Sequence, residues 1–120
     1  MSRQQLQVKR VYEEPDVSDG TRVLVDRLWP RGLARSKANI DQWCKEVAPT
    51  TGLRRWYGHD PDRFEEFRRR YLCELAERDH EEAVARLRSM AAGSPLTLVT
   101  ATREVDISAA AVLAEHLQRR

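Results

Sequence analysis

Two short apolar runs that stand far apart in the chain constrain the fold most. The first is Val23-Leu24-Val25, inside an expected strand from Arg22 to Asp26, and the second is Leu96 to Thr100. A continuous β-favouring run of this kind is typical of a strand that is covered on both faces. About seventy residues with helical patterns separate the two runs. Because strands joined by a long helical crossover are normally parallel, the sequence predicts an α/β fold with a parallel sheet.

The first half of that crossover carries two helix signals. Asn39 with Gln42 three positions later has the pattern of a capping box, and predicts a helix that ends at Pro49. Thr51 is the expected cap of a short helix that stops near Gly58. Both segments are therefore expected to be helical.

The second half of the crossover predicts the longest helix. Asp60-Pro61 combines an N-cap residue with proline in the first turn, and an apolar stripe that begins at Phe64 follows at helical spacing. The helix restarts or continues over residues 79–91. After the strand at Leu96 to Thr100, a last helix begins at Asp106 or Ser108.

A further strand is expected over Leu6 to Tyr12, where apolar and polar residues alternate. About nine residues join it to the strand at Arg22, too few for a normal crossover, so the relative direction of these two strands stays open. We predict one α/β domain over residues 1–120. Its sheet is small, mainly parallel and three-stranded, with a fourth short strand as an option, and helices flank it in a Rossmann-like layering.

Composition limits the class of protein. No apolar run approaches the ~20 residues that span a bilayer, and the N-terminus lacks an apolar signal core, so we expect a cytoplasmic protein without a membrane partner. The 21 basic and 19 acidic residues nearly balance, which does not by itself imply nucleic acid. Arginine far outnumbers lysine, and its planar fork suits phosphate and carboxylate. A GC-rich genome would also explain that excess.

Metal and thiol chemistry find little support. Cys44 and Cys73 stand in no CxxC pattern, and Cys44 is expected on a helix rather than at a strand end. The three histidines share no ligand spacing, and the dipeptide His59-Asp60 alone is common. We therefore expect neither a metal site nor a cofactor.

The candidate site lies where the two apolar strands end. In open α/β sheets, ligands bind outside the carboxyl ends of the strands. There the chain places an acid, three arginines, hydroxyl groups and the N-terminus of the last helix, which together favour an anion. Asp26 is the candidate catalytic residue. The candidate ligand-binding residues are Arg27, Trp29, Arg31, Thr100, Thr102, Arg103 and Ser108.

The step Trp29-Pro30 stiffens the loop after the second strand, and Gly32 permits a positive φ. Held in this way, the loop would present its arginines with less freedom to lose on binding. In the competing interpretation, Asp26 and Arg27 form a structural ion pair and Trp29 fills the core. The residues alone leave both interpretations open.

The predicted partner is a small anionic ligand, such as a nucleotide or a phosphorylated metabolite. The alternative is a nucleic-acid-associated or regulatory module without catalysis, which would use Arg54, Arg55 and Arg68 to Arg70. Whether the protein is an enzyme, and in which oligomeric state it exists, the residues leave open.

Several strings resemble a known family over nearly the whole chain. KRVY, DG-RVLVDRLWPRG, W-KE-AP-T-LR-WYGHDP and PLTLV are similar to those of the YeaO-like proteins, the group called domain of unknown function 488. The resemblance implies a small bacterial or archaeal α/β domain without an established biochemical role. The match is residue for residue over the signature from Asp26 to Gly32.

The chain departs from that pattern near its C-terminal strand. The family resembles LLYSAK there, whereas this sequence has LVTATR, with Thr100 in place of tyrosine and Arg103 in place of lysine. A later Asn-His pair of the family is replaced by Ser108-Ala109. If that pair takes part in a reaction, the resemblance implies an impaired or altered activity here, because an imidazole is missing from the edge.

Overall fold

The computed structural model describes residues 6–118 of the chain, and these build a four-stranded parallel sheet. The strands are β1 (Leu6–Arg10), β2 (Thr21–Leu24), β3 (Gln42–Trp43) and β4 (Leu96–Thr100). Their order in the sheet is β1-β4-β2-β3, and every neighbouring pair is parallel. This confirms the α/β class, and β3 is the optional fourth strand. The first two strands are parallel without touching, because β4 lies between them.

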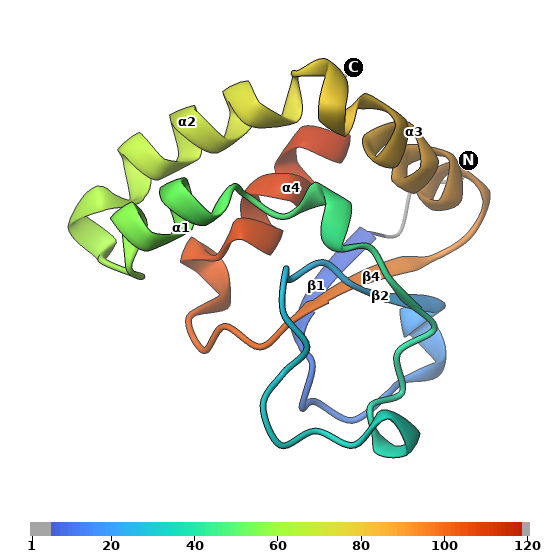
Figure 1. Ribbon diagram of the computed structural model, residues 1–120. Coiled ribbons are helices and arrows are strands. Elements are labelled where there is room, and N and C mark those ends of the chain that lie inside the picture. Colours follow the sequence, from blue (N-terminus) through green and yellow to red (C-terminus); the bar gives the residue numbers. More distant parts are fainter. Residues whose placement is uncertain (1–5, 119–120) are drawn as a thin grey trace.

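The described part of the chain also contains four α-helices, which pack on one face of the sheet (Figure 1). They are α1 (Thr51–Tyr57), α2 (Phe64–Leu75), α3 (Arg78–Gly93) and α4 (Ala109–Gln118). Single 3-10 turns lie at Val17–Asp19, Arg35–Lys37, Lys45–Val47, Pro61–Arg63 and Val105–Ile107. No helix among residues 6–118 is long and apolar enough to cross a membrane.

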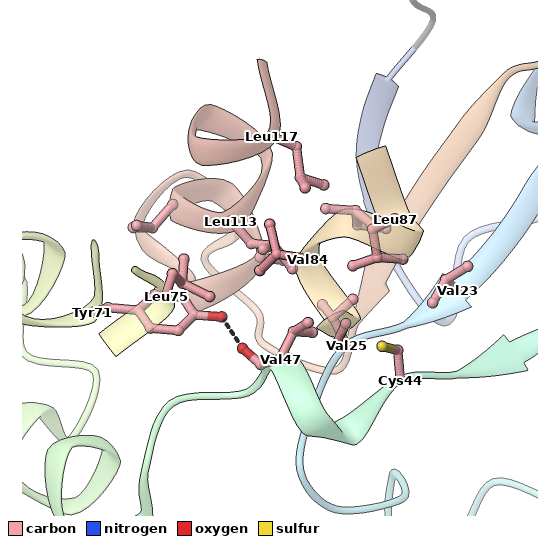
Figure 2. Packing of buried hydrophobic residues seen from close by; sticks show 14 of the residues in the cluster. Val23, Val25, Cys44, Val47, Tyr71, Leu75, Val84, Leu87, Leu113 and Leu117 are labelled. Carbon is pink, nitrogen blue, oxygen red and sulfur yellow. Dashed lines mark hydrogen bonds between the residues drawn. The ribbon is translucent and has the colours of Figure 1, made fainter. Parts of the chain in front are cut away.

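The main core lies between the sheet and the helices. β2 and β4 contribute their alternate residues, such as Val23 and Leu98, which are fully buried. Leu113 of α4 and Leu87 of α3 belong to the same buried cluster (Figure 2). The hydroxyl of the buried Tyr71 donates a hydrogen bond to the carbonyl of Val47 (Figure 2). This hydrogen bond ties α2 to the chain just after β3, near the carboxyl ends of the strands.

A smaller core lies on the opposite face of the sheet, where no α-helix of the described residues packs. Val11, Leu24 and Val99 form it, and both Trp29 and Trp43 pack against it. Extended chain and 3-10 turns cover this face, chiefly residues 25–41. The two faces of the sheet therefore differ. α-Helices cover one face, and extended chain with 3-10 turns, which we call the loop layer, covers the other.

The helix predicted from Asn39 to Pro49 is wrong. Asn39 is left-handed, with φ 53°, and an N-cap needs an extended residue instead. Gln42 and Trp43 pair with Val23 and Leu24 as β3, so only the 3-10 turn at Lys45–Val47 is helical. The open edge of β2 offered backbone partners that a local capping pattern could not reveal.

The other helix starts follow the predicted chemistry closely. Thr50 rather than Thr51 caps α1, and Gly58 ends it with a left-handed φ of 53°. Asp60 accepts a hydrogen bond from the backbone N–H of Asp62, and the 3-10 turn that it caps leads directly into α2. Ser108, not Asp106, caps α4, since its Oγ accepts the N–H of Ala111.

Candidate ligand site at the carboxyl edge of the sheet

Asp26 lies immediately beyond β2 and joins the ends of three strands. Val25 still donates its N–H to Val99 at 3.2 Å, so the chain is extended up to the carboxylate. The Asp26 carboxylate accepts the hydroxyl of Thr100 at 2.7 Å and the N–H of Ala101 at 2.8 Å. Its backbone carbonyl accepts the indole N–H of Trp43 at 2.8 Å. The residue therefore fastens the end of β2 to the ends of β4 and β3.

Burial raises the pKa of the Asp26 carboxyl above its ordinary value. The hydrogen bonds from Ala101 and Thr100 oppose this effect, and so do the positive charges of His59 and Arg54, but burial outweighs them. All direct partners of the carboxylate are neutral. The carboxyl group is consequently poised for protonation at a higher pH than an exposed aspartate.

Two cationic residues, Arg54 in α1 and His59 just after it, act electrostatically on Asp26. Gly58 and His59 are both left-handed, with φ of 53° and 57°, and these two residues turn the chain out of α1. Arg54 and His59 are exposed, and neither forms an ion pair within residues 6–118. Their charges nevertheless act on Asp26. Sequence reasoning missed this contribution, although Gly-His after a helix was a visible signal.

Two predicted ligand residues serve the scaffold instead. The Arg27 guanidinium donates to the carbonyl of Pro49 at 3.1 and 3.3 Å and to that of Ala48 at 3.4 Å. It therefore clamps the segment before α1, and no ion pair with Asp26 forms. Trp29 donates its indole N–H to Leu33 at 2.7 Å and packs into the smaller core.

Two of the three predicted hydroxyl groups, those of Thr100 and Ser108, already form hydrogen bonds within the protein. Thr100 donates to Asp26 and accepts the N–H of Thr102 at 3.2 Å, while 1% of its surface is exposed. Ser108 donates to the carbonyl of Val105 at 2.6 Å besides capping α4, and it is equally buried. Thr102 is half-buried, and no hydrogen bond to its hydroxyl is present in the described part of the chain.

Arg31 and Arg103 are exposed, and neither contacts Asp26 or forms an ion pair among the residues described. The structure thus brings Asp26, Thr100 and the backbone of Thr102 together, and the charges of Arg54 and His59 act on Asp26. The two exposed arginines stand in the loops that leave β2 and β4. In the described chain, no three His, Cys, Asp or Glu side chains are placed to hold a metal ion.

A polar hollow of about 330 Å³ lies at the other edge of the sheet, near the amino ends of β2 and β3. It contains none of the predicted ligand residues. Its lining residues are Pro15, Asp16, Gly20, Arg22, Arg35, Ser36, Asn39, Ile40 and Asp41.

Cys44 corrects a further expectation. It follows β3 directly, at a strand end and not on a helix, and it is buried with 2% of its surface exposed. Burial raises the pKa of its thiol, although Arg86 donates to the sulfur at 3.4 Å. A raised pKa keeps the thiol protonated, so its reactivity is low. Cys44 and Cys73 are both free.

Comparisons with known proteins agree in one family. A family model described as "Inactive DUF488-N3 subclade" matches residues 5–120. Uncharacterized protein Rv3073c of Mycobacterium tuberculosis and Uncharacterized protein Mb3100c of Mycobacterium bovis are each 50% identical over 115 residues, which cover 96% of this chain and 95% of the relative. Uncharacterized protein YeaO of Escherichia coli is 42% identical over 113 residues, 94% of this chain and 96% of YeaO. No solved structure matches.

Proposed function

The chain belongs to the YeaO-like DUF488 family, and from this premise we propose that it binds a small anionic ligand at the carboxyl edge of its sheet without catalysing a reaction. One observation carries the proposal. Arg54 and His59 act electrostatically on the buried carboxyl of Asp26, which lies at the ends of β2 and β4, while neither has an acidic partner in the described residues. Ligands of open α/β sheets bind at this position.

The chemistry of the edge favours a ligand that carries both an anionic group and a hydroxyl group. The guanidinium of Arg54 offers a planar fork that matches a phosphate or a carboxylate. The carboxylate of Asp26 uses one hydrogen bond on each oxygen and keeps lone pairs for a ligand hydroxyl. Nucleotides and sugar phosphates combine these two groups.

Three points support binding over reaction. The family model that matches carries the word "Inactive" in its description. The position of the family's Asn-His pair holds Ser108-Ala109, and Ser108 is occupied as a helix cap. Asp26 has its carboxylate fixed by two donors from β4 and the residue after it, which suits positioning better than proton transfer.

A thermal-shift panel of phosphate, nucleotides, sugar phosphates and dicarboxylates tests the proposal. We expect one class to raise the melting temperature saturably, since a ligand at a hundred times its Kd stabilises by about 2.7 kcal/mol. Arg54→Gln and His59→Gln should each weaken that shift. Arg55→Gln is the matched control, because Arg55 is an exposed neighbour on α1 and is not among the main causes of the pKa shift of Asp26. Absence of any saturable shift, or a shift that Arg54→Gln leaves intact, would overturn the proposal.

A further inference from the structure

The loop layer carries a local excess of positive charge. Residues 27–45 contain five basic residues and one acid, whereas the whole chain has 21 and 19. The part of the segment before β3 covers the face of the sheet away from the four helices of the described chain (Figure 1). Five of its residues form what we call the tryptophan–arginine surface. They are Trp29, Arg35, Lys37, Trp43 and Lys45.

The two tryptophans of this surface are fixed in place. Both indole N–H groups donate to backbone carbonyls, those of Leu33 and Asp26, at 2.7 and 2.8 Å. The rings meet edge to face, with centroids 5.5 Å apart and planes at 68°. Each is only partly buried against the smaller core. A rigid aromatic pair loses little conformational entropy when it is covered by a partner.

Cations lie over these rings. The guanidinium of Arg35 is 4.5 Å from the centroid of Trp29 and 5.8 Å from that of Trp43, and the ammonium of Lys45 is 5.2 Å from Trp43. Arg35, Lys37 and Lys45 are exposed, and none forms an ion pair within residues 6–118. Positive charge and flat apolar surface are thus available at one place.

The basic run on α2 differs in this respect. Arg68 pairs with Glu115, and both Arg69 and Arg70 pair with Glu66. These two acids offset two of the three positive charges in the run that the sequence presented as the candidate nucleic-acid patch. Charge complementarity to a polyanion therefore favours the loop layer over α2.

We propose that the tryptophan–arginine surface binds single-stranded nucleic acid. Arg35, Lys37 and Lys45 would contact phosphates, and a base would stack on the guanidinium of Arg35, whose other side lies on Trp29. A double helix fits less well, since no α-helix lies on this face to enter a groove in the described chain.

Fluorescence anisotropy with a labelled oligothymidylate of about twelve nucleotides tests the proposal. The variant Arg35→Gln/Lys37→Gln/Lys45→Gln should weaken binding at about 50 mM salt by about tenfold or more. It should also reduce the slope of log K against log salt by about 2, because each phosphate contact contributes about 0.7 for single strands. Arg69→Gln/Arg70→Gln/Arg78→Gln removes the same charge from exposed positions elsewhere and should change both values little.

Two further arms separate stacking from charge alone. Trp56 lies on α1, so Trp56→Phe leaves the two tryptophans of the surface as the fluorophores. The oligonucleotide should then change their emission, and an abasic strand of equal length should not. An acidic peptide that binds as tightly as the oligonucleotide, equal losses in both triple variants, or no binding by the wild-type chain would each overturn the proposal. Arg54→Gln should leave this binding intact, which separates its failure from that of the small-ligand site.

Discussion

Asp19 and Asp26 lie at the two ends of β2, and opposite surroundings give them opposite properties. Asp19 is 1% exposed and contacts two cations, Lys9 at 3.1 Å and Arg22 at 2.7 Å. Asp26 receives only neutral donors, from Thr100 and Ala101. An ion network satisfies the carboxylate at the amino end of the strand, whereas the carboxyl group at the other end has only neutral hydrogen-bond donors and feels the charges of Arg54 and His59. The difference separates scaffold from candidate site.

The pKa values express the same contrast. Burial by itself would raise the pKa of Asp19, but the hydrogen bonds from Lys9, Arg22 and the N–H of Asp16 together outweigh it and lower the pKa. At Asp26 burial prevails and the pKa rises. By linkage, Asp19 stabilises the fold above its unfolded pKa and loses that contribution as pH falls through its folded pKa.

The largest expected effect comes from breaking the network at the amino end. Asp19→Asn leaves the buried guanidinium of Arg22 without its counter-charge, and removing one member of a buried pair costs about 3–5 kcal/mol. Urea denaturation at neutral pH measures the free energy of unfolding. Asp106→Asn, at an exposed position, serves as the control. A loss for Asp19→Asn no larger than that of the control would show that the network is not structural.

Gly20 tests the same end through the backbone. Its φ is 62°, and an added Cβ would overlap the backbone carbonyl of Pro95, which accepts the N–H of Thr21. Gly20→Ala should therefore cost roughly 2–4 kcal/mol from strain and overpacking. Gly32→Ala shares the positive φ, 77°, but meets no atom within 4 Å, so about 1 kcal/mol is expected. Equal melting temperatures for the two variants would refute the steric argument.

At the carboxyl end, Thr100→Val should have a smaller effect. It removes the hydroxyl that donates to Asp26 and that accepts the N–H of Thr102, and unsatisfied buried groups cost about 1–3 kcal/mol. Because Asp26 keeps the Ala101 N–H, we expect a value near the lower limit, measured by thermal unfolding. Thr100→Ser retains the hydroxyl and should recover most of the loss. If serine is as damaging as valine, packing of the methyl group explains the effect instead.

Local patterns predicted the parts of the fold that local chemistry determines. The apolar runs became β2 and β4, and Asp60-Pro61 opened the turn into α2. The pairing of Gln42 and Trp43 with β2 escaped prediction, because it depends on an open strand edge about twenty residues away in the chain. A capping pattern carries no information about such a partner.

The candidate site shows the same limit. Asp26 could be placed at a strand end from the sequence, but its partners could not, since Thr100 is 74 positions away. The guanidinium of Arg27 has the chemistry of an anion-binding group, but it donates to the carbonyl of Pro49 instead. Only the folded chain brings that carbonyl within reach. Arg54 and His59 were seen as parts of other patterns, and their electrostatic effect on Asp26 depends on how α1 packs in the folded chain.

The sharpest test of the comparison is the pH dependence of Asp26→Asn. A carboxyl whose folded pKa is raised contributes stability that is fully present below its unfolded pKa and is lost as pH rises through the folded pKa. The asparagine variant lacks this loss, so it should gain stability relative to the wild type as the pH rises from about 4, the ordinary pKa of an aspartate, through the raised pKa of folded Asp26. The gain should be about 1.4 kcal/mol for each pH unit that separates the folded from the unfolded pKa of Asp26.

Unfolding free energies of both proteins at several pH values in this window give the difference, in which the titration of other groups largely cancels. His59 acts on Asp26, and a second comparison in the His59→Gln background removes its contribution. If the difference in unfolding free energy between the two proteins does not depend on pH, the pKa of Asp26 is not raised by folding. The contrast with Asp19 would then rest on hydrogen bonds alone.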